Sequence, residues 1–156
     1  MSRLIARFDV CYPSFHLNVS LDVPTSGITV LFGPSGSGKT TLLRCLAGLE
    51  RASDGFMQFG NDVWQDEARG VCQPLSTRPI GYVFQEPRLF PHYSVRSNLL
   101  YGYKRISAEE RRISIEQVVT ILGIGHLLDR RTHKLSGGEQ QRVAIGRAFS
   151  RVPSCC

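Results

Sequence analysis

The 156-residue sequence predicts an α/β fold, with strands in its first half and helices in its middle. Apolar and polar residues alternate over 3–10 and 15–23, which is typical of half-buried antiparallel strands. Continuous apolar runs stand at 28–32 and 80–84, and helical patterns cover most of 94–128. Hydrophobic residues make up 42% of the chain, which is enough for a core, so we expect an α/β core with a helical insertion.

The strands of the first half are predicted to be of two kinds. The two alternating segments predict an N-terminal antiparallel hairpin, and 55–64 predicts another with its turn at Gly60-Asn61. The runs "ITVLF" at 28–32 and "IGYVF" at 80–84 are apolar throughout. Such runs favour parallel strands that are covered on both faces, so these two are expected at the centre of a buried sheet.

Turn-forming residues predict the loops, and apolar residues at helical spacing predict the helices. Polar residues with glycine and two prolines predict a loop over 65–79. The pattern "KTTLLRCLAGLE" predicts a helix from Lys39, and "SVRSNLLYGY" predicts another from Ser94. A longer helical stretch is predicted to open on a Ser-x-x-Glu capping box at Ser107–Glu110.

Composition argues against several other classes of protein. The net charge is +6, but basic residues never run longer than two, so the charge is interpreted as a solvated face and no nucleic-acid partner is expected. No apolar run approaches the roughly 20 residues of a membrane span, and nothing near the N-terminus resembles a signal peptide. The cysteines lack C-x-x-C spacing, which favours free thiols, and the histidines are interpreted as ordinary surface or core residues. These residues are Cys11, Cys45, Cys72, Cys155, Cys156, His16, His92, His126 and His133.

A glycine-rich loop follows the first apolar run. The segment "GPSGSGKT" matches G-x-x-x-x-G-K-[ST], with a predicted strand before it and a predicted helix after it. Backbone N–H groups of such a loop point at phosphates, the lysine reaches the β- and γ-phosphates, and the threonine hydroxyl can ligate Mg²⁺. The motif alone leaves an ATPase, a GTPase or a small-molecule kinase open, although no Asn-Lys-x-Asp segment for guanine is present. The predicted phosphate site consists of Gly33, Pro34, Ser35, Gly36, Ser37, Gly38, Lys39, Thr40 and Thr41.

A second glycine pair stands before the last helical run, in "LSGGEQQR" at 135–142. Ser136 and Glu139 form a capping box there. A cap alone does not call for Gly137 and Gly138, each of which costs stability within a helix. Two glycines and a serine at a helix N-terminus make a second anion-binding surface.

These motifs, in this order and spacing, resemble the nucleotide-binding subunits of ATP-binding cassette (ABC) transporters, a P-loop NTPase family. The resemblance implies ATP and Mg²⁺ as cofactors and a head-to-tail dimer with two ATPs at its interface. Ser136, Gly137, Gly138 and Gln140 would then meet the γ-phosphate held by a second subunit.

The resemblance also assigns roles to single residues. Gln85, directly after "IGYVF", matches the catalytic glutamine that approaches Mg²⁺ and the attacking water, so Thr40 and Gln85 are the expected Mg²⁺ ligands. The family stacks an N-terminal aromatic on adenine, for which Tyr12 is the candidate and Phe15 the alternative. Leu89, Phe90 and Tyr93 would contact a membrane permease, although they could equally pack inward.

Within the family, "GYVFQEPRLFPHYSVRSNLLYG" and "LLGIGHLLDRR" look most like the ATP-binding subunit of molybdate importers. This implies permease subunits and, indirectly, a solute-binding protein as partners, and a peripheral place on the cytoplasmic face of the membrane. Sulfate, iron(III) and polyamine importers share much of the pattern. A non-catalytic nucleotide-binding module remains a third possibility, and the compact spacing argues against ABC proteins of DNA repair or translation.

In the family, a strand beyond the signature helix ends in an Asp-Glu pair, and a histidine follows. Residues 141–156 contain neither. The chain is therefore expected to be an N-terminal fragment of one ABC ATPase domain, unable to hydrolyse ATP alone, with a frameshift or truncation behind its Cys-Cys end. Its expected parts are a β-subdomain with the P-loop core over 1–86, a helical subdomain over 87–134, and the signature with its helix over 135–156.

Overall fold

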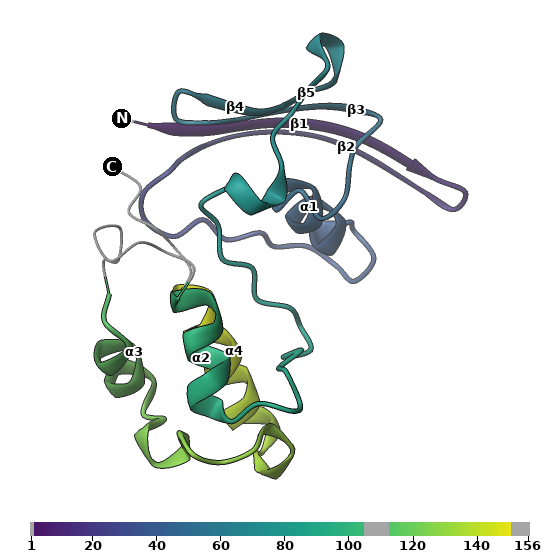
Figure 1. Ribbon diagram of the computed structural model, residues 1–156. Coiled ribbons are helices and arrows are strands. Elements are labelled where there is room, and N and C mark those ends of the chain that lie inside the picture. The colour runs from purple at the N-terminus through teal and green to yellow at the C-terminus, as the bar shows by residue number, and fades with distance from the viewer. Residues whose placement is uncertain (1, 105–112, 151–156) are drawn as a thin grey trace. The chain divides into compact units, whose positions relative to one another are not determined.

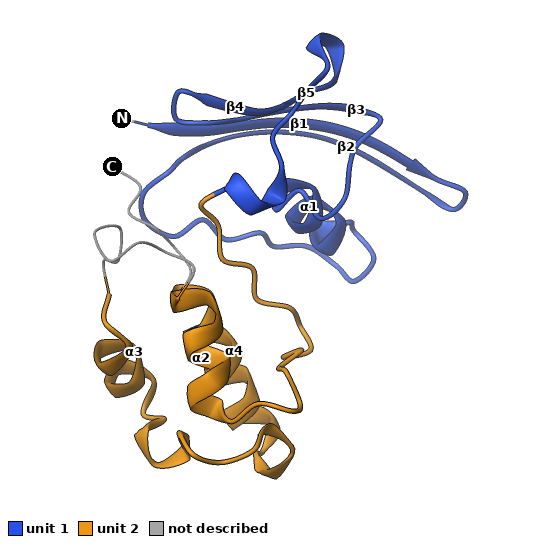
Figure 2. Cartoon of the chain, viewed as in Figure 1, with its two compact units in different colours: residues 1–78 blue, residues 79–156 orange. Residues whose placement is uncertain are grey.

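The computed structural model describes residues 2–104 and 113–150. The chain divides into two compact units, residues 1–78 and 79–156, which Figure 2 colours separately. We describe each unit by itself. No helix in the described ranges is long and apolar enough to cross a membrane.

Unit 1 contains one sheet of five strands, all paired antiparallel (Figure 1). Both predicted hairpins are confirmed, and the turn of the second has Gly60 at a φ of 60°. The order across the sheet is β2-β1-β3-β4-β5. The strands are β1 (Arg3–Tyr12), β2 (Phe15–Pro24), β3 (Asp54–Phe59), β4 (Asp62–Asp66) and β5 (Val71–Cys72).

The core of unit 1 lies between one face of this sheet and helix α1 (Lys39–Leu46). Alternation in β1 sends Ala6, Phe8 and Val10 to the buried face, while the residues between them face outward. Leu42 and Cys45 are the buried residues of α1. Each fully buried apolar side chain contributes about 1.5–3 kcal/mol, so this interface holds the helix that follows the glycine loop.

The predicted parallel strands are wrong in this structure. Residues 28–32 and 80–84 form no strand, and Ile28, Val30 and Phe32 are 94%, 77% and 100% exposed. An apolar run becomes a strand only when another backbone pairs with it. No strand of the described residues pairs with either run, and the two runs belong to different units.

The segment 65–79 was predicted as a loop, and it is more ordered than that. Gln65 and Asp66 end β4, and β5 pairs with them; single 3₁₀ turns lie at Glu67–Arg69 and Leu75–Thr77. The segment ends at Arg78, which is only 4% exposed. Its guanidinium donates to the carbonyls of Gln73 and Trp64 and lies over the Trp64 ring. A buried arginine thus ties this segment to the sheet.

Unit 2 is helical, with α2 (Val95–Tyr103), α3 (Ile115–Leu122) and α4 (Gly137–Phe149). The predicted cap at Ser107–Glu110 lies outside the described residues. Helix α3 instead begins at a capping box of Ser114 and Gln117, which the sequence analysis missed. Short 3₁₀ turns lie at Gly125–Leu127 and Thr132–Lys134. The buried core consists of Val95, Leu99, Ile124, Leu127, Leu135 and Val143.

Helix α4 approaches its two neighbours closely at Gly146. A Cβ at this position would lie 2.9 Å from Leu99 Cδ2 and 3.0 Å from Leu122 Cδ1. Glycine therefore lets α4 pack against side chains of α2 and α3 at the same point. This contact lies in the second half of α4, whose first residues are the second glycine pair.

Candidate functional site

The glycine loop leads directly into α1, and two of its glycines have backbone angles that favour glycine. Gly36 and Gly38 have φ values of 82° and 86°, in the left-handed region. Gly38 is the residue before the helix, and no side chain caps that end. The first N–H groups of α1 therefore have no side-chain partner, which is the arrangement that binds anions at helix N-termini.

Lys39 is folded back into this loop. Its ammonium donates to the carbonyl oxygens of Gly33 (2.9 Å) and Pro34 (2.6 Å) and to the Ser37 hydroxyl (3.3 Å). The three acceptors hold the positive charge inside the curve of the loop. A phosphate that entered the loop would meet this charge directly. Of the next residues, Thr40 is exposed and Thr41 is half-buried.

An aromatic pair lies beside the loop within the same unit. Tyr12 and Phe15 face each other across the end of the first hairpin, with ring centroids 6.4 Å apart and planes 23° apart. A Cβ built on Gly38 would lie 2.6 Å from Phe15 Cζ. The structure thus brings Phe15 against the loop, with Tyr12 39% exposed next to it.

The second glycine pair starts α4. Ser136 caps the helix: its hydroxyl accepts from Glu139 N (3.3 Å), and Glu139 Oε2 accepts from Ser136 N (2.7 Å) and from the Ser136 hydroxyl (2.9 Å). The predicted capping box is confirmed. The hydrogen bond from the Ser136 backbone holds the pKa of Glu139 below its usual range. A Cβ on Gly137 or Gly138 would meet nothing within 4 Å, so this helix start presents bare backbone.

Leu135 faces the interior of unit 2, and Gln140 is half-buried. The Gln140 amide donates to the carbonyls of Thr132 (3.4 Å) and Leu135 (3.2 Å). Leu135 is 7% exposed and belongs to the core. The buried Leu135 and the hydrogen-bonded Gln140 therefore hold the backbone on either side of Ser136 and the two glycines.

Gln85 is exposed in an extended segment of unit 2. The glutamine amide of Gln141 donates to the carbonyl of Phe84, its neighbour, at 3.5 Å. Arg147 donates to the carbonyls of Pro87 (3.3 Å) and Arg88 (3.0 Å). The segment is thus attached to α4 on both sides of Gln85. The glycine loop belongs to unit 1 and Gln85 to unit 2.

The segment after Gln85 is pinned by Asn98, which the sequence analysis missed. Asn98 is fully buried; its Oδ1 accepts from Phe90 N (2.9 Å), and its Nδ2 donates to the carbonyls of Phe90 (3.2 Å) and Ser94 (3.0 Å). Leu89 packs against the core, while Phe90 and Tyr93 are half-buried. A polar residue on the buried face of a predicted helix was the available signal for Asn98.

An aromatic cluster covers this segment. The rings of Phe90 and Tyr101 lie 4.5 Å apart, those of Phe90 and Tyr93 5.6 Å apart, and those of His92 and Tyr93 4.2 Å apart. The guanidinium of Arg147 lies over the Phe90 ring at 5.2 Å. The side chains proposed for a permease contact therefore pack inward on one side and reach the surface on the other.

A glycine loop that leads into a helix is the defining feature of a P-loop NTPase, and this chain adds a second glycine pair at a capped helix start. The profile of the family described as ABC transporter matches residues 17–155. The chain belongs to this family.

Similar proteins have names that are more specific than that of the family. The chain is 57% identical over 148 residues to the molybdenum import ATP-binding protein ModC 1 of Azotobacter vinelandii, covering 95% of this chain and 41% of the relative. It is 56% identical over 153 residues to the molybdenum import ATP-binding protein ModC of Methylococcus capsulatus, covering 98% and 42%. The chain thus spans about two fifths of the length of the curated relatives it matches.

Proposed function

We propose that this chain is the nucleotide-binding part of an ABC importer subunit that uses ATP to drive molybdate uptake. The observation that carries this proposal is the loop at 33–39, where Lys39 is held at 2.6–2.9 Å by two loop carbonyls beside the uncapped start of α1. The solute is proposed from the names of the relatives, because the solute does not touch this kind of subunit. Sulfate, iron(III) and polyamine importers remain the alternatives.

ATP would be bound by the glycine loop through its phosphates. Gly33, Pro34, Ser35, Gly36, Ser37 and Gly38 would wrap the phosphates, Lys39 would pair with the β- and γ-phosphates, and Thr41 would add a contact. The Phe15 ring lies against Gly38, and the Tyr12 ring lies 6.4 Å from it, so either could stack on adenine. Tyr12 stays the candidate, and the contact with Gly38 supports Phe15 as the alternative.

The residues present fit Mg²⁺ in chemistry. Mg²⁺ prefers oxygen ligands and keeps several waters, so the exposed Thr40 hydroxyl and the Gln85 amide oxygen suit it together with phosphate oxygens. When bound, the ion neutralises charge on the phosphates. Thr40 lies in the first turn of α1, and Gln85 is exposed.

A second subunit would complete each ATP site. Ser136, Gly137 and Gly138 present a bare helix N-terminus, which suits a γ-phosphate held by the partner's loop. Gln140 contributes by fixing the backbone before the helix. A head-to-tail dimer is therefore the proposed assembly, with the segment around Phe90 and Tyr93 facing permease subunits. The subunit would sit peripherally on the cytoplasmic face of the membrane, and a solute-binding protein would act through the permease.

A chain of residues 1–156 is proposed to bind ATP without useful turnover. Residues 140–156 contain no Asp or Glu, so these residues supply no carboxylate that could polarise the attacking water or ligate Mg²⁺.

The experiment is titration of this chain with a fluorescent ATP analogue, alongside phosphate release. Lys39→Ala should weaken binding about tenfold or more, because a charge-assisted contact is worth about 1.5–3 kcal/mol. Lys104→Ala, an exposed lysine of unit 2, is the matched control and should bind as the parent does. Equal affinity in Lys39→Ala would place the nucleotide elsewhere. Mg²⁺-dependent turnover that Lys39→Ala abolishes would contradict the proposed lack of hydrolysis.

A further inference from the structure

Three metal-ligating side chains of different type gather at the end of the first hairpin. Cys11 of β1 and His16 of β2 are direct partners in the strand register, and Asp9 precedes Cys11 by two residues. Residues two apart on a strand, and direct partners across strands, share one face of the sheet. The carboxylate, thiol and imidazole atoms all lie within 4.8 Å of one another.

The three groups already contact one another. His16 Nε2 lies 2.8 Å from Asp9 Oδ1, and Cys11 Sγ lies 3.8 Å from the same oxygen. Asn18 Nδ2 donates to Asp9 Oδ2 at 2.8 Å, which holds the carboxylate from its other side. The hydrogen bond to His16 lowers the pKa of Asp9.

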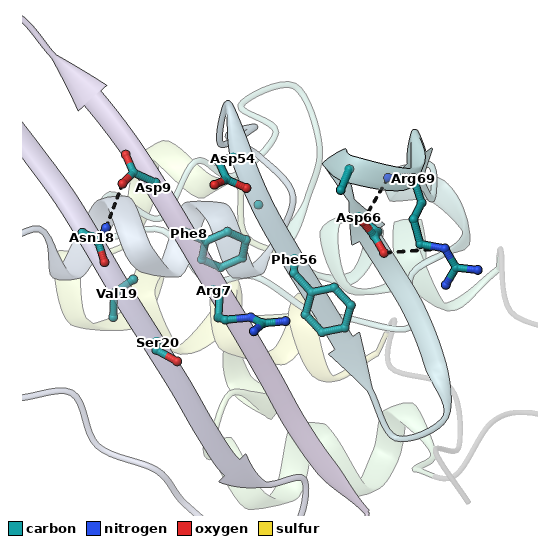
Figure 3. Close-up of a pocket in the computed structure, with 12 residues that line it drawn as sticks. Arg7, Phe8, Asp9, Asn18, Val19, Ser20, Asp54, Phe56, Asp66 and Arg69 are labelled. Atoms are coloured by element: carbon teal, nitrogen blue, oxygen red, sulfur yellow. Dashed lines mark hydrogen bonds and ion pairs between the residues drawn. The ribbon is translucent and has the colours of Figure 1, made fainter.

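The face that carries these groups is the open side of the sheet, away from α1. Asp9 and Asn18 line a hollow on this face together with Arg7, Asp54, Phe56 and Asp66 (Figure 3). In Figure 3 the Asp9 carboxylate points toward Asn18, while the Arg7 guanidinium extends toward Phe56, over whose ring it lies at 5.1 Å. No arginine of the hollow is paired with Asp9, and Cys11 and His16 are exposed to solvent.

We propose that Asp9, Cys11 and His16 bind one divalent transition-metal ion of the zinc type, a site separate from the oxygen-ligated Mg²⁺ of the nucleotide. Zn²⁺ takes sulfur, nitrogen and oxygen ligands at about 2.0–2.3 Å, which places ligand atoms about 3–4 Å apart around a tetrahedron. The separation of 2.8 Å between His16 Nε2 and Asp9 Oδ1 lies just below this range, and that of 3.8 Å between Cys11 Sγ and the same oxygen lies within it, so side-chain rotation suffices. The thiol selects against Mg²⁺ and Ca²⁺, which prefer oxygen ligands.

The ion would leave one coordination position for water. Asn18 would keep its bond to Asp9 and orient the carboxylate, as partners of metal ligands commonly do. Because all three ligands belong to one two-stranded hairpin, binding needs no movement between the units.

The test is titration of the reduced chain with Co²⁺, which reports thiolate ligation through a charge-transfer absorption band. The parent chain should show the band at one equivalent, and Zn²⁺ should displace the Co²⁺. Cys11→Ser should abolish the band, and His16→Ala and Asp9→Asn should weaken binding at least about tenfold. The controls Cys72→Ser and His126→Ala alter exposed residues outside the cluster and should titrate as the parent does.

A second measurement on the unaltered chain avoids any effect of substitution on folding. Zn²⁺ should protect Cys11 from alkylation, read by mass spectrometry, and leave the exposed Cys72 reactive. No cobalt band in the parent chain, a band that persists in Cys11→Ser, or equal alkylation of Cys11 with and without Zn²⁺ would each overturn the proposal.

Discussion

The ring of Phe15 occupies the space that a side chain on Gly38 would need. A Cβ at Gly38 would lie 2.6 Å from Phe15 Cζ and 3.0 Å from Leu17 Cδ1. Gly38 also has a φ of 86°, which residues with a Cβ rarely adopt. The end of the first hairpin and the phosphate loop are therefore in contact through a position that only glycine fills without strain.

Gly38→Ala should lower the free energy of unfolding by about 2–4 kcal/mol, because it adds backbone strain and a collision with Phe15. Gly36→Ala is the matched control: its φ is similar, but its Cβ would meet nothing within 4 Å, so a loss of about 1–2 kcal/mol is expected. Urea unfolding followed through Trp64, the single tryptophan, measures both. In Phe15→Ala/Gly38→Ala the two losses should not add. Equal losses of unfolding free energy in Gly38→Ala and Gly36→Ala would show that the collision with Phe15 does not contribute.

Arg78→Ala should cost about 2–4 kcal/mol of stability. It removes the side-chain donor of the Gln73 carbonyl and one of the two donors of the Trp64 carbonyl, which keeps the Gln73 N–H, and it takes a buried side chain away from the Trp64 ring. Arg69→Ala, an exposed arginine with a 4.0 Å ion pair, should stay within about 0.5 kcal/mol of the parent. Urea unfolding by Trp64 fluorescence distinguishes them, and similar midpoints would show that the buried guanidinium does not hold this segment.

Asn98→Ala should destabilise unit 2 by about 2–3 kcal/mol, because three buried hydrogen bonds to Phe90 and Ser94 are lost together. Far-UV circular dichroism during urea unfolding reports on the helices. The control is Arg96→Ala on the same helix, whose exposed pair with Asp129 is worth little. A loss in Asn98→Ala no larger than in Arg96→Ala would contradict this role.

Phe90→Glu should break co-purification with permease subunits in a full-length subunit while ATP affinity stays unchanged. The segment carrying Phe90 is held by Asn98 and reaches the surface beside Tyr93. Lys104→Glu, at an exposed position of unit 2, is the control, and it changes the charge by more than Phe90→Glu does. Permease binding that survives Phe90→Glu would place the contact on another surface.

The capping box of α4 predicts an acid-dependent stability. The pKa of Glu139 is lowered in the folded chain, chiefly by the Ser136 backbone N–H, so its carboxylate stabilises the fold above the unfolded value of about 4.3. This contribution is lost as the pH falls through the lower, folded pKa. Glu139→Gln lacks the ionised group, so it should be less stable than the parent at pH 7 and converge with it in acid. A gap that stays constant with pH would exclude the carboxylate as its source.

Local signals predicted the elements that depend on near neighbours. The hairpins at 3–24 and 54–66 and the cap at Ser136 are correct because alternation, turn residues and Ser-x-x-Glu spacing act within a few residues. The runs at 28–32 and 80–84 were wrong as strands, because a parallel strand depends on partners that its own residues do not encode.

In the candidate site, too, features that depend on neighbouring residues were predicted, and features that depend on distant residues were not. The glycine loop and the signature are contiguous motifs, so they were predicted from the sequence. The contact of Phe15 with Gly38, the burial of Arg78 and the meeting of Cys11 with His16 depend on strand register or on segments far apart in the chain. His16 was interpreted as an ordinary residue because its partners become visible only when β1 and β2 are paired.

The exposed run at 28–32 has a consequence for handling this chain. Ile28, Val30 and Phe32 present apolar, β-favouring side chains outside every strand ladder of the described residues. Such a segment is a template on which other extended chains stack. Concentrated preparations should therefore lose monomer at a rate that rises steeply with concentration, and during synthesis the segment should occupy holdase chaperones. Storage lifetime, more than the unfolding midpoint, will set how long a sample remains usable.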